Sequence, residues 1–305
     1  MRYQFYTADV FTDQPFAGNP LAVFPEAEGL SPEQMGRVAR EFNYPETVFV
    51  FPPQEPAHTC RLRIFTPGIE LPFAGHPTLG AAYILASIGR IPLSGAVTPA
   101  IFEEGVGPVP VSIRAEQGRP VSAQLTAAQA PEFGPPPPPL ERMAALLSLD
   151  VSELRNDDLT PQALSCGVPF LYIPLHNRQA LGRIRLNRQV WAEAFAGYWA
   201  PHIYVFTPDP ELPGSDLRAR MFAPAMDIEE DPATGAAVTA LGAYLGLRHP
   251  AADGTLQWRV EQGFEMGRPS LLEVEADKVN DQIAALRVSG AAVLVSEGMM
   301  EIPKA

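Results

Sequence analysis

The sequence predicts an α/β protein whose two halves share one plan, each with β-strands around a buried helix. The first observation behind this prediction is an internal repeat whose two copies lie about half the chain apart. In each copy a strand ends at proline, an acidic turn follows, and a polar residue with proline opens an Ala-rich helix. The two copies run from Arg63–Pro67 through Glu70 to His76–Ala82, and from Arg220–Pro224 through Glu230 to Asp231–Ala237.

The second observation is that the helical segment of each copy is apolar on all sides. Nearly every residue from Leu79 to Ile88 and from Ala236 to Leu245 is apolar or small. A helix without a polar face belongs in a protein core. Gly89 and Gly246 then offer the glycine that commonly ends a helix. Each half is therefore expected to pack its strands around one such helix.

The other elements of the first half follow from alternation, capping and turn signals. Ser31 is a good N-cap, Pro32 suits the first helical position, and Gln34 completes a near capping box. Apolar residues at helical spacing follow, and Asn43-Tyr44-Pro45 ends this helix. Strands are predicted at residues 3–11, 21–24, 46–51 and 60–65.

Five consecutive prolines, Pro135 to Pro139, stand near the midpoint of the chain. Such a run is a stiff extended spacer, and the sharper alternative is a polyproline ligand for a partner protein. The spacer interpretation divides the chain into residues 1–134 and 135–285, with residues 286–305 returning to the first half. A helix at 140–149 follows, and Ser165–Ile173 echoes Gly18–Phe24, which supports duplication of a whole domain.

Composition excludes several classes of function. The 305 residues include 22 Lys and Arg against 35 Asp and Glu, for a formal net charge of −13. A surface of that sign repels phosphate backbones, so no nucleic-acid partner is expected. Cys60 and Cys166 are too few for a disulfide framework. No signal segment and no stretch of about 20 apolar residues is present, so we expect a cytoplasmic protein that does not span a membrane.

Cofactor motifs are also missing from the sequence. The other histidines have no acidic or cysteine partner at metal-ligand spacing. Gly105-Val106-Gly107 opens no helix, so it is no dinucleotide fingerprint, and no Gly-x-Ser-x-Gly elbow occurs. We therefore expect no metal and no other cofactor.

The candidate chemistry lies at the predicted starts of the two buried helices. A helix start offers unpaired backbone N–H groups and the positive end of the dipole, which together suit a carboxylate. His76 stands at one start and Asp231 at the other. The simpler interpretation is that Asp231 is an N-cap and His76 an ordinary turn residue. Because capping does not require different residues in the two copies, the unlike pair favours a site for proton transfer in a shared cleft.

Glu46 is the third candidate. It follows Pro45 and precedes the strongly apolar segment Val48–Phe51. A carboxyl group beside apolar surface is partly desolvated, which suits a general acid or base that works near neutral pH. The alternative is an exposed glutamate at the end of a strand, since glutamate is seldom buried.

At this point the motifs identify a resemblance over effectively the whole chain. The sequence resembles the PhzF-like family of phenazine biosynthesis isomerases, which are relatives of diaminopimelate epimerase. Each motif is weak by itself, but their order is specific for the family. They are Asp9-Val10-Phe11-Thr12, Gly18-Asn19-Pro20, Pro45-Glu46-Thr47, Phe65-Thr66-Pro67, Gly75-His76-Pro77-Thr78-Leu79, Gly167-Val168-Pro169-Phe170, Glu230–Gly235, Glu261-Gln262-Gly263 and Met266–Ser270.

The resemblance implies two pseudo-symmetric domains, each a curved, mostly antiparallel sheet around a central helix, with the site between them. It also implies a homodimeric isomerase that needs no cofactor. The family's catalytic carboxylate falls on Glu46, and its accompanying polar residues fall on His76 and Asp231. Asn19 and the helix starts would bind a small carboxylate-bearing substrate, the helix starts through Gly75, Thr234, Gly235 and Ala236.

Two departures bear on the substrate. Diaminopimelate epimerase uses two cysteines at the entrances of its two central helices. In this sequence the resemblance places His76 and Asp231 there, so racemisation by two cysteines is not available. Ala236 stands where family members commonly have serine, so a hydroxyl contact to substrate is lost. Two rival interpretations remain open: a non-catalytic protein that binds small anions in the same cleft, and an acidic scaffold that engages partners through its proline run.

Overall fold

The computed structural model describes residues 1–303 and has the predicted mixed α/β fold, in which strands outnumber helices. The chain divides into two compact units. The first contains residues 1–126 together with the described residues from Ser289 on, and the second is Ala127–Val288. The proline run thus lies inside the second unit, several residues after its start.

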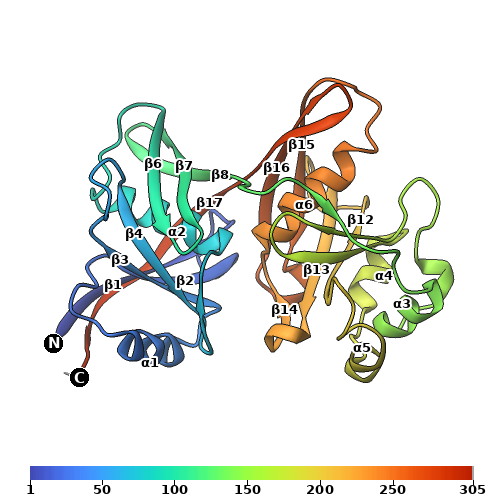
Figure 1. The fold of residues 1–305 in the computed structure, drawn as a ribbon, viewed down its shortest axis with the longest axis horizontal. Coiled ribbons are helices and arrows are strands. Elements are labelled where there is room, and N and C mark those ends of the chain that lie inside the picture. Colours follow the sequence, from blue (N-terminus) through green and yellow to red (C-terminus); the bar gives the residue numbers. More distant parts are fainter. Residues whose placement is uncertain (304–305) are drawn as a thin grey trace. The chain divides into compact units, whose positions relative to one another are not determined.

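The first unit contains most of the strands that precede the proline run (Figure 1). Its elements are β1 (Arg2–Val10), β2 (Asn19–Phe24), α1 (Pro32–Phe42), β3 (Glu46–Phe51), β4 (Cys60–Phe65), β5 (Glu70–Leu71), α2 (Gly75–Ser87), β6 (Val97–Glu104), β7 (Gly107–Glu116), β8 (Arg119–Thr126) and the later part of β17 (Gln282–Glu301).

Strand pairing in the first unit brings the starts of β2 and β3 together. β1 pairs with β17 and with β2 in antiparallel fashion. β2 and β3 are parallel, and Leu21 lies opposite Glu46. β4 is antiparallel to β3 and parallel to β6, where Arg61 lies opposite Glu103. Helix α2 contacts β1, β2 and β3 as well as β7 and β8, and His76 through Ala82 are all buried.

Helix α1 confirms the predicted capping box. The Ser31 hydroxyl accepts from the backbone N–H of Gln34 at 3.2 Å, and the Ser31 N–H donates to the Gln34 side chain at 2.8 Å. Each bond satisfies a donor that the helix itself leaves unpaired. The apolar face of α1 packs Met35 and Val38 into a cluster with Phe24 and Phe49. Helix α1 thereby covers the strand that begins at Glu46.

The second unit contains the remaining helices. Its elements are β9 (Glu132–Phe133), α3 (Leu140–Leu147), β10 (Gln162–Ser165), β11 (Pro169–Pro174), α4 (Arg178–Arg183), α5 (Arg188–Ala194), β12 (His202–Thr207), β13 (Leu217–Ala223), β14 (Ile228–Asp231), α6 (Gly235–Gly246), β15 (Gly254–Gln262), β16 (Ser270–Val279) and the start of β17, with short 3₁₀ helices at Val151–Glu153, Pro224–Met226 and Phe264–Met266.

The strand register of the second unit repeats the order of pairings found in the first. β11 and β12 are parallel, with Phe170 opposite His202. β12 and β13 are antiparallel, and β13 and β15 are parallel, with Arg218 opposite Glu261. Helix α6 contacts β10, β15 and β16 and is buried along most of its length. Helices α3, α4 and α5 belong to a separate apolar cluster that includes Leu171 and Ile203.

Candidate functional site

The first unit brings Glu46 and His76 together, as the sequence analysis expected of catalytic partners. Glu46 is the first residue of β3, and His76 is the second residue of α2. His76 Nδ1 lies 3.3 Å from Glu46 Oε2, and the two side chains are only 8% and 12% exposed. A carboxylate and an imidazole at this distance can exchange or share a proton. Because the Glu46 side chain is only 12% exposed, the structure rejects the alternative of an exposed glutamate at the end of a strand.

Burial controls the charge of His76. Loss of hydration lowers the pKa of His76 to about 3, and the backbone of Pro20 opposes this shift only in part because it favours the charged ring. Pro20 lies in β2, directly after Asn19, and β2 pairs with β3 at Glu46. The imidazole is thus neutral at pH 7, with one nitrogen as donor and the other as acceptor.

The lowered pKa of His76 predicts a loss of stability in mild acid. The unfolded chain binds a proton near the ordinary pKa of 6.5, whereas the folded ring binds one only near 3. Between these values the unfolded state holds more protons, so the free energy of unfolding falls as the pH falls, by about 1.4 kcal/mol per pH unit. Relative to a variant without this ring, wild type should therefore lose about 1.6 kcal/mol in urea unfolding between pH 6.5 and 5.

The matched variants for this measurement are His76→Asn and His176→Asn. The first removes the buried titrating ring and should lack its contribution, so that wild type loses more stability than this variant as the pH falls. The second removes an exposed ring and should leave the limb as in wild type. Equal slopes for wild type and His76→Asn would show that the ring titrates normally in the folded protein.

In the second unit Asp231 is held by a network at the start of α6. Thr234 Oγ1 donates to Asp231 Oδ2 at 2.5 Å, and the buried Gln262 donates from Nε2 to the Asp231 carbonyl at 2.8 Å. Gln262 Nε2 also lies 3.0 Å from Thr234 Oγ1, and Gln262 Oε1 accepts from the Tyr204 hydroxyl at 3.2 Å. Asp231 is only 8% exposed. Thr234 at the helix start therefore bonds the carboxylate, while Gln262 of β15, itself bonded to Tyr204 of β12, holds the Asp231 backbone.

One expectation about this pair is wrong. Asp231 does not occupy a helix start equivalent to that of His76. It ends β14, four residues before α6 begins at Gly235, and the N-cap of α6 is Thr234. Asp231 is consequently not an N-cap either. The second residue of α6, which corresponds to His76 in α2, is Ala236.

The physical reason is that the two prolines used to match the copies have different roles. Pro77 is the third residue of α2, where its missing N–H costs nothing. Pro232 precedes α6 and lies outside it. The true match of Pro232 is Pro72, because Glu70, Pro72 and Gly75 in one unit have the same spacing as Glu230, Pro232 and Gly235 in the other.

The predicted substrate-binding residues lie at the start of β2 and at the starts of helices α2 and α6. Asn19 is fully buried at the start of β2, beside Pro20. Gly75 is the first residue of α2, and Gly235 and Ala236 are the first two residues of α6. Thr234 and Ala236 are partly exposed. Backbone N–H groups of a first helical turn have no partner within the helix, so both helix starts can bind an anion.

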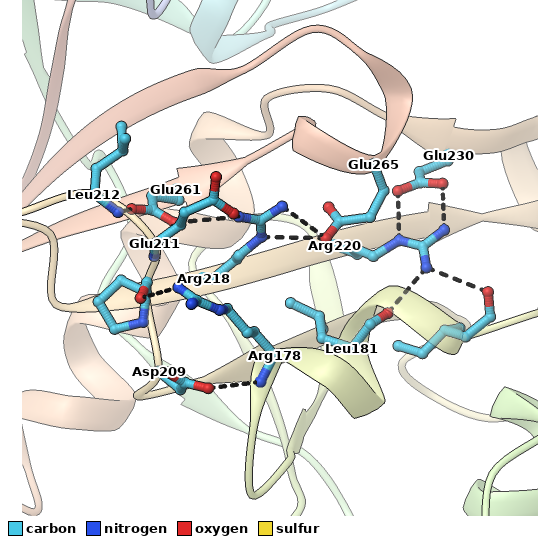
Figure 2. Close-up of polar contacts among 12 residues, drawn as sticks. Arg178, Leu181, Asp209, Glu211, Leu212, Arg218, Arg220, Glu230, Glu261 and Glu265 are labelled. Atoms are coloured by element: carbon cyan, nitrogen blue, oxygen red, sulfur yellow. Dashed lines mark hydrogen bonds and ion pairs between the residues drawn. The ribbon is translucent and has the colours of Figure 1, made fainter.

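Charged residues on β13 anchor this part of the second unit (Figure 2). Arg220 makes two parallel bonds of 2.7 Å to Glu230, and Arg218 bonds Glu211 at 2.8 Å and Glu265 at 3.0 Å. Glu261 is fully buried and accepts from the backbone N–H of Leu212 at 2.6 Å. These bonds join β13 to β14 and to the segments beside β15, and Asp231 and Gln262 are the last residues of β14 and β15.

Sequence reasoning did not assign a role to Gln262 or His202. Gln262 stands in the Glu261-Gln262-Gly263 motif, which contributed to the family resemblance but did not indicate a role for Gln262. His202 is the first residue of β12 after Pro201, just as Glu46 is the first residue of β3 after Pro45. It is 5% exposed, burial lowers its pKa, and its Nδ1 has no hydrogen-bond partner in the described chain. The repeated Pro-polar-apolar pattern at the two strand starts is the signal that could have found it.

No group of three or more His, Cys, Asp or Glu side chains in residues 1–303 is arranged to hold a metal ion. Likewise, within this range no helix combines the length and the apolar character that crossing a membrane requires.

Comparisons with known proteins agree over nearly the whole chain. A family model described as phenazine biosynthesis-like protein matches residues 8–298. An uncharacterized isomerase of Mesorhizobium japonicum is 40% identical over 298 residues, covering 96% of this chain and 97% of that protein. The trans-2,3-dihydro-3-hydroxyanthranilate isomerase of Pseudomonas aeruginosa is 31% identical, with coverage of 97% and 98%. The crystal structure of a Bacillus anthracis phenazine biosynthesis protein of the PhzF family superposes with a TM-score of 0.89 at 26% identity, covering 99% of this chain and all of that one.

Proposed function

The chain belongs to the phenazine biosynthesis-like (PhzF) family and is an isomerase, and from this premise we propose that Glu46 catalyses proton transfer on a small carboxylate-bearing substrate without a cofactor. The observation that carries the proposal is the buried contact of 3.3 Å between Glu46 and His76. A general base needs a positioned acceptor within reach of the substrate and a neighbour that sets its protonation. The neutral ring of His76 can be that neighbour.

In the proposed reaction Glu46 removes a proton from a carbon next to a carbonyl or unsaturated system. The electrons of the broken C–H bond move into that system, and the proton returns at a different carbon. No atoms are gained or lost, which is what an isomerase requires. His76 holds the Glu46 carboxyl group in place and takes part in the proton relay.

We further propose that the start of α6 serves the same substrate. Asp231 is held by Thr234 and Gln262, and the N–H groups from Thr234 to Ala236 lie beside it. Such groups stabilise a substrate carboxylate and the charge that develops during proton transfer. In this proposal the two units are pseudo-symmetric curved sheets around α2 and α6, and a common cleft takes one substrate. The repeated order of strand pairings within each unit supports the pseudo-symmetry.

The test is deuterium incorporation in D₂O. Candidate substrates are small unsaturated carboxylates, beginning with trans-2,3-dihydro-3-hydroxyanthranilate, the substrate in the name of the Pseudomonas aeruginosa relative. We expect product that carries deuterium at the new C–H position, and NMR measures its incorporation. Asp231→Asn should raise KM or lower kcat for the same substrate. Tight binding without any exchange would instead support the rival function, a non-catalytic protein that binds small anions.

We also propose a homodimer, which family resemblance alone supports. Light scattering coupled to size-exclusion chromatography should give twice the chain mass of 33.0 kDa. A single-chain mass at micromolar concentration would remove this part of the proposal.

A further inference from the structure

A second buried carboxyl group lies behind the first turn of α2. Glu104 ends β6 and is only 8% exposed. Its Oε1 lies 2.6 Å from the Oγ1 of Thr78, which is two residues after His76 in the helix. Thr78 Oγ1 also lies 2.7 Å from the carbonyl oxygen of Ala74, the N-cap of α2. Glu104 is thus linked through the Thr78 hydroxyl to Ala74, the N-cap residue of α2.

The number of hydrogens decides the charge of Glu104 in this arrangement. The Thr78 hydroxyl has a single hydrogen, and the Ala74 carbonyl oxygen can only accept. When that hydrogen lies between Thr78 and Ala74, the short contact with Glu104 needs a hydrogen on the carboxyl group. Both bonds therefore exist together only when Glu104 is protonated and donates to Thr78.

The surroundings of Glu104 agree with a neutral acid. Its Oε2 is buried and has no hydrogen-bond partner in residues 1–303, which would be costly for a carboxylate. Cys60 on β4 offers no positive charge that would favour a carboxylate, and burial is the main cause that raises the pKa of its thiol to about 12. Burial of Glu104 itself raises its pKa to about 8, and the Thr78 bond only partly offsets this.

Most of the other charged groups near Glu104 have charged partners elsewhere, and Arg61, whose Nε has no hydrogen-bond partner in residues 1–303, lies over an aromatic ring. A hollow of about 510 Å³ beside it is lined by Arg61, Arg63, Glu70 and Glu103, among others. Arg63 makes two bonds, of 2.7 and 2.6 Å, to Glu70. Glu103 accepts from the backbone N–H groups of Gln54 and Glu55 and contacts His58 Nδ1 at 2.9 Å. The Arg61 guanidinium lies over the Phe51 ring at 5.0 Å.

The second unit has glutamine at the corresponding position. In the parallel pairs β4–β6 and β13–β15, Arg61 lies opposite Glu103 and Arg218 lies opposite Glu261. The next residues are Glu104 and Gln262. Gln262 bonds the segment that leads into α6, as Glu104 does at α2 through Thr78. A protonated carboxyl and a carboxamide have nearly the same shape, and each offers one acceptor and a donor.

We infer that Glu104 is a positioning residue that acts as a neutral carboxylic acid and, through Thr78 and Ala74, holds the helix turn that carries His76. The inference rests on the proposed function for its kinetic readout only. When Glu104 loses its proton, the Thr78 hydroxyl turns its hydrogen to the carboxylate and the Ala74 bond is lost. The first turn of α2 then loosens, and the contact between His76 and Glu46 loosens with it.

The kinetic test compares kcat against pH for wild type and Glu104→Gln, each relative to its own rate at pH 6.5. Wild type should lose about tenfold between pH 7 and 9, since one pH unit above its pKa about a tenth of an acid remains protonated. Glu104→Gln cannot ionise and should lose less than threefold. Thr78→Ser keeps the hydroxyl and should retain the wild-type alkaline limb. An unchanged alkaline limb in Glu104→Gln would overturn the inference.

Two measurements need no catalytic activity. The infrared carbonyl band of a protonated buried carboxyl should be present in wild type at pH 7 and disappear as the pH rises through 8. The urea midpoint of wild type should fall as the pH rises from 6.5 to 8, above the range in which His76 affects stability, because the folded state binds the Glu104 proton more tightly, and Glu104→Gln should lack this fall. Absence of the infrared band in wild type at pH 7 would refute the inference even if the variant failed to fold. Failure of the isomerase assay with these two results intact would refute the proposed function alone.

Discussion

Replacing Glu46 with glutamine is expected to lower the rate of isomerisation and of deuterium exchange by about 10²- to 10⁴-fold, the range typical for loss of a general base. The amide keeps the size of the side chain and can still contact His76 at the start of α2. It cannot accept a proton from carbon at neutral pH. Stability should change little, so the loss belongs to the chemical step. The measurement is kcat in H₂O and the exchange rate in D₂O.

The matched control is Glu41→Gln, which makes the same chemical change at an exposed position of α1. It should retain the wild-type rate, because Glu41 has no part in the proposed site. If Glu46→Gln and wild type exchanged protons equally fast, Glu46 would be removed from the mechanism, and His76 or Asp231 would have to supply the base.

Replacing Gly263 with alanine is expected to destabilise the second unit by about 3–5 kcal/mol, a combination of overpacking and backbone strain. Gly263 follows Gln262 and has a φ of +78°. A Cβ atom there would lie 2.5 Å from the Arg268 carbonyl oxygen and 2.6 Å from that of Pro232. Both neighbours are backbone atoms, so the strand end must move. Because Pro232 follows Asp231, the movement should also displace the carboxylate and lower activity.

Gly267→Ala separates the two causes of this loss. Gly267 ends the same short helical turn with a φ of +69°, but nothing lies within 4 Å of a Cβ placed there. Gly267→Ala should lower the free energy of unfolding only by the strain of the left-handed backbone conformation, about 1–2 kcal/mol. Urea unfolding of both variants gives the comparison. Equal losses in the two proteins would contradict the role assigned to the close approach of Gly263 and Pro232.

Several features follow from local sequence because their causes are local. The capping box of α1 involves residues three apart. The burial of α2 and α6 follows from segments with no polar face, and the short strands follow from alternation and proline. Glu46 and His76 were candidates because of a proline before one and an apolar helix after the other. The structure places His76 Nδ1 3.3 Å from Glu46 Oε2.

The match between the two copies was decided by tertiary structure. Aligning Pro77 with Pro232 places His76 and Asp231 at equivalent sites, but the helix bounds show that Ala236 corresponds to His76. A helix start depends on which N–H and C=O groups find partners, and those partners come from strands far along the chain. The same holds for Glu103-Glu104-Gly105, whose correspondence with Glu261-Gln262-Gly263 appears only when β4 pairs with β6 and β13 with β15.

The sequence by itself therefore determined the α/β class, the two buried helices and the family to which the chain belongs. Only the tertiary structure decided that Asp231 ends a strand and that Glu104 needs its proton. The physical reason is that charge and register depend on neighbours brought together by folding. The hydroxyl of Thr78 can satisfy both Ala74 and Glu104 in one protonation state alone, and no spacing within the sequence records that constraint.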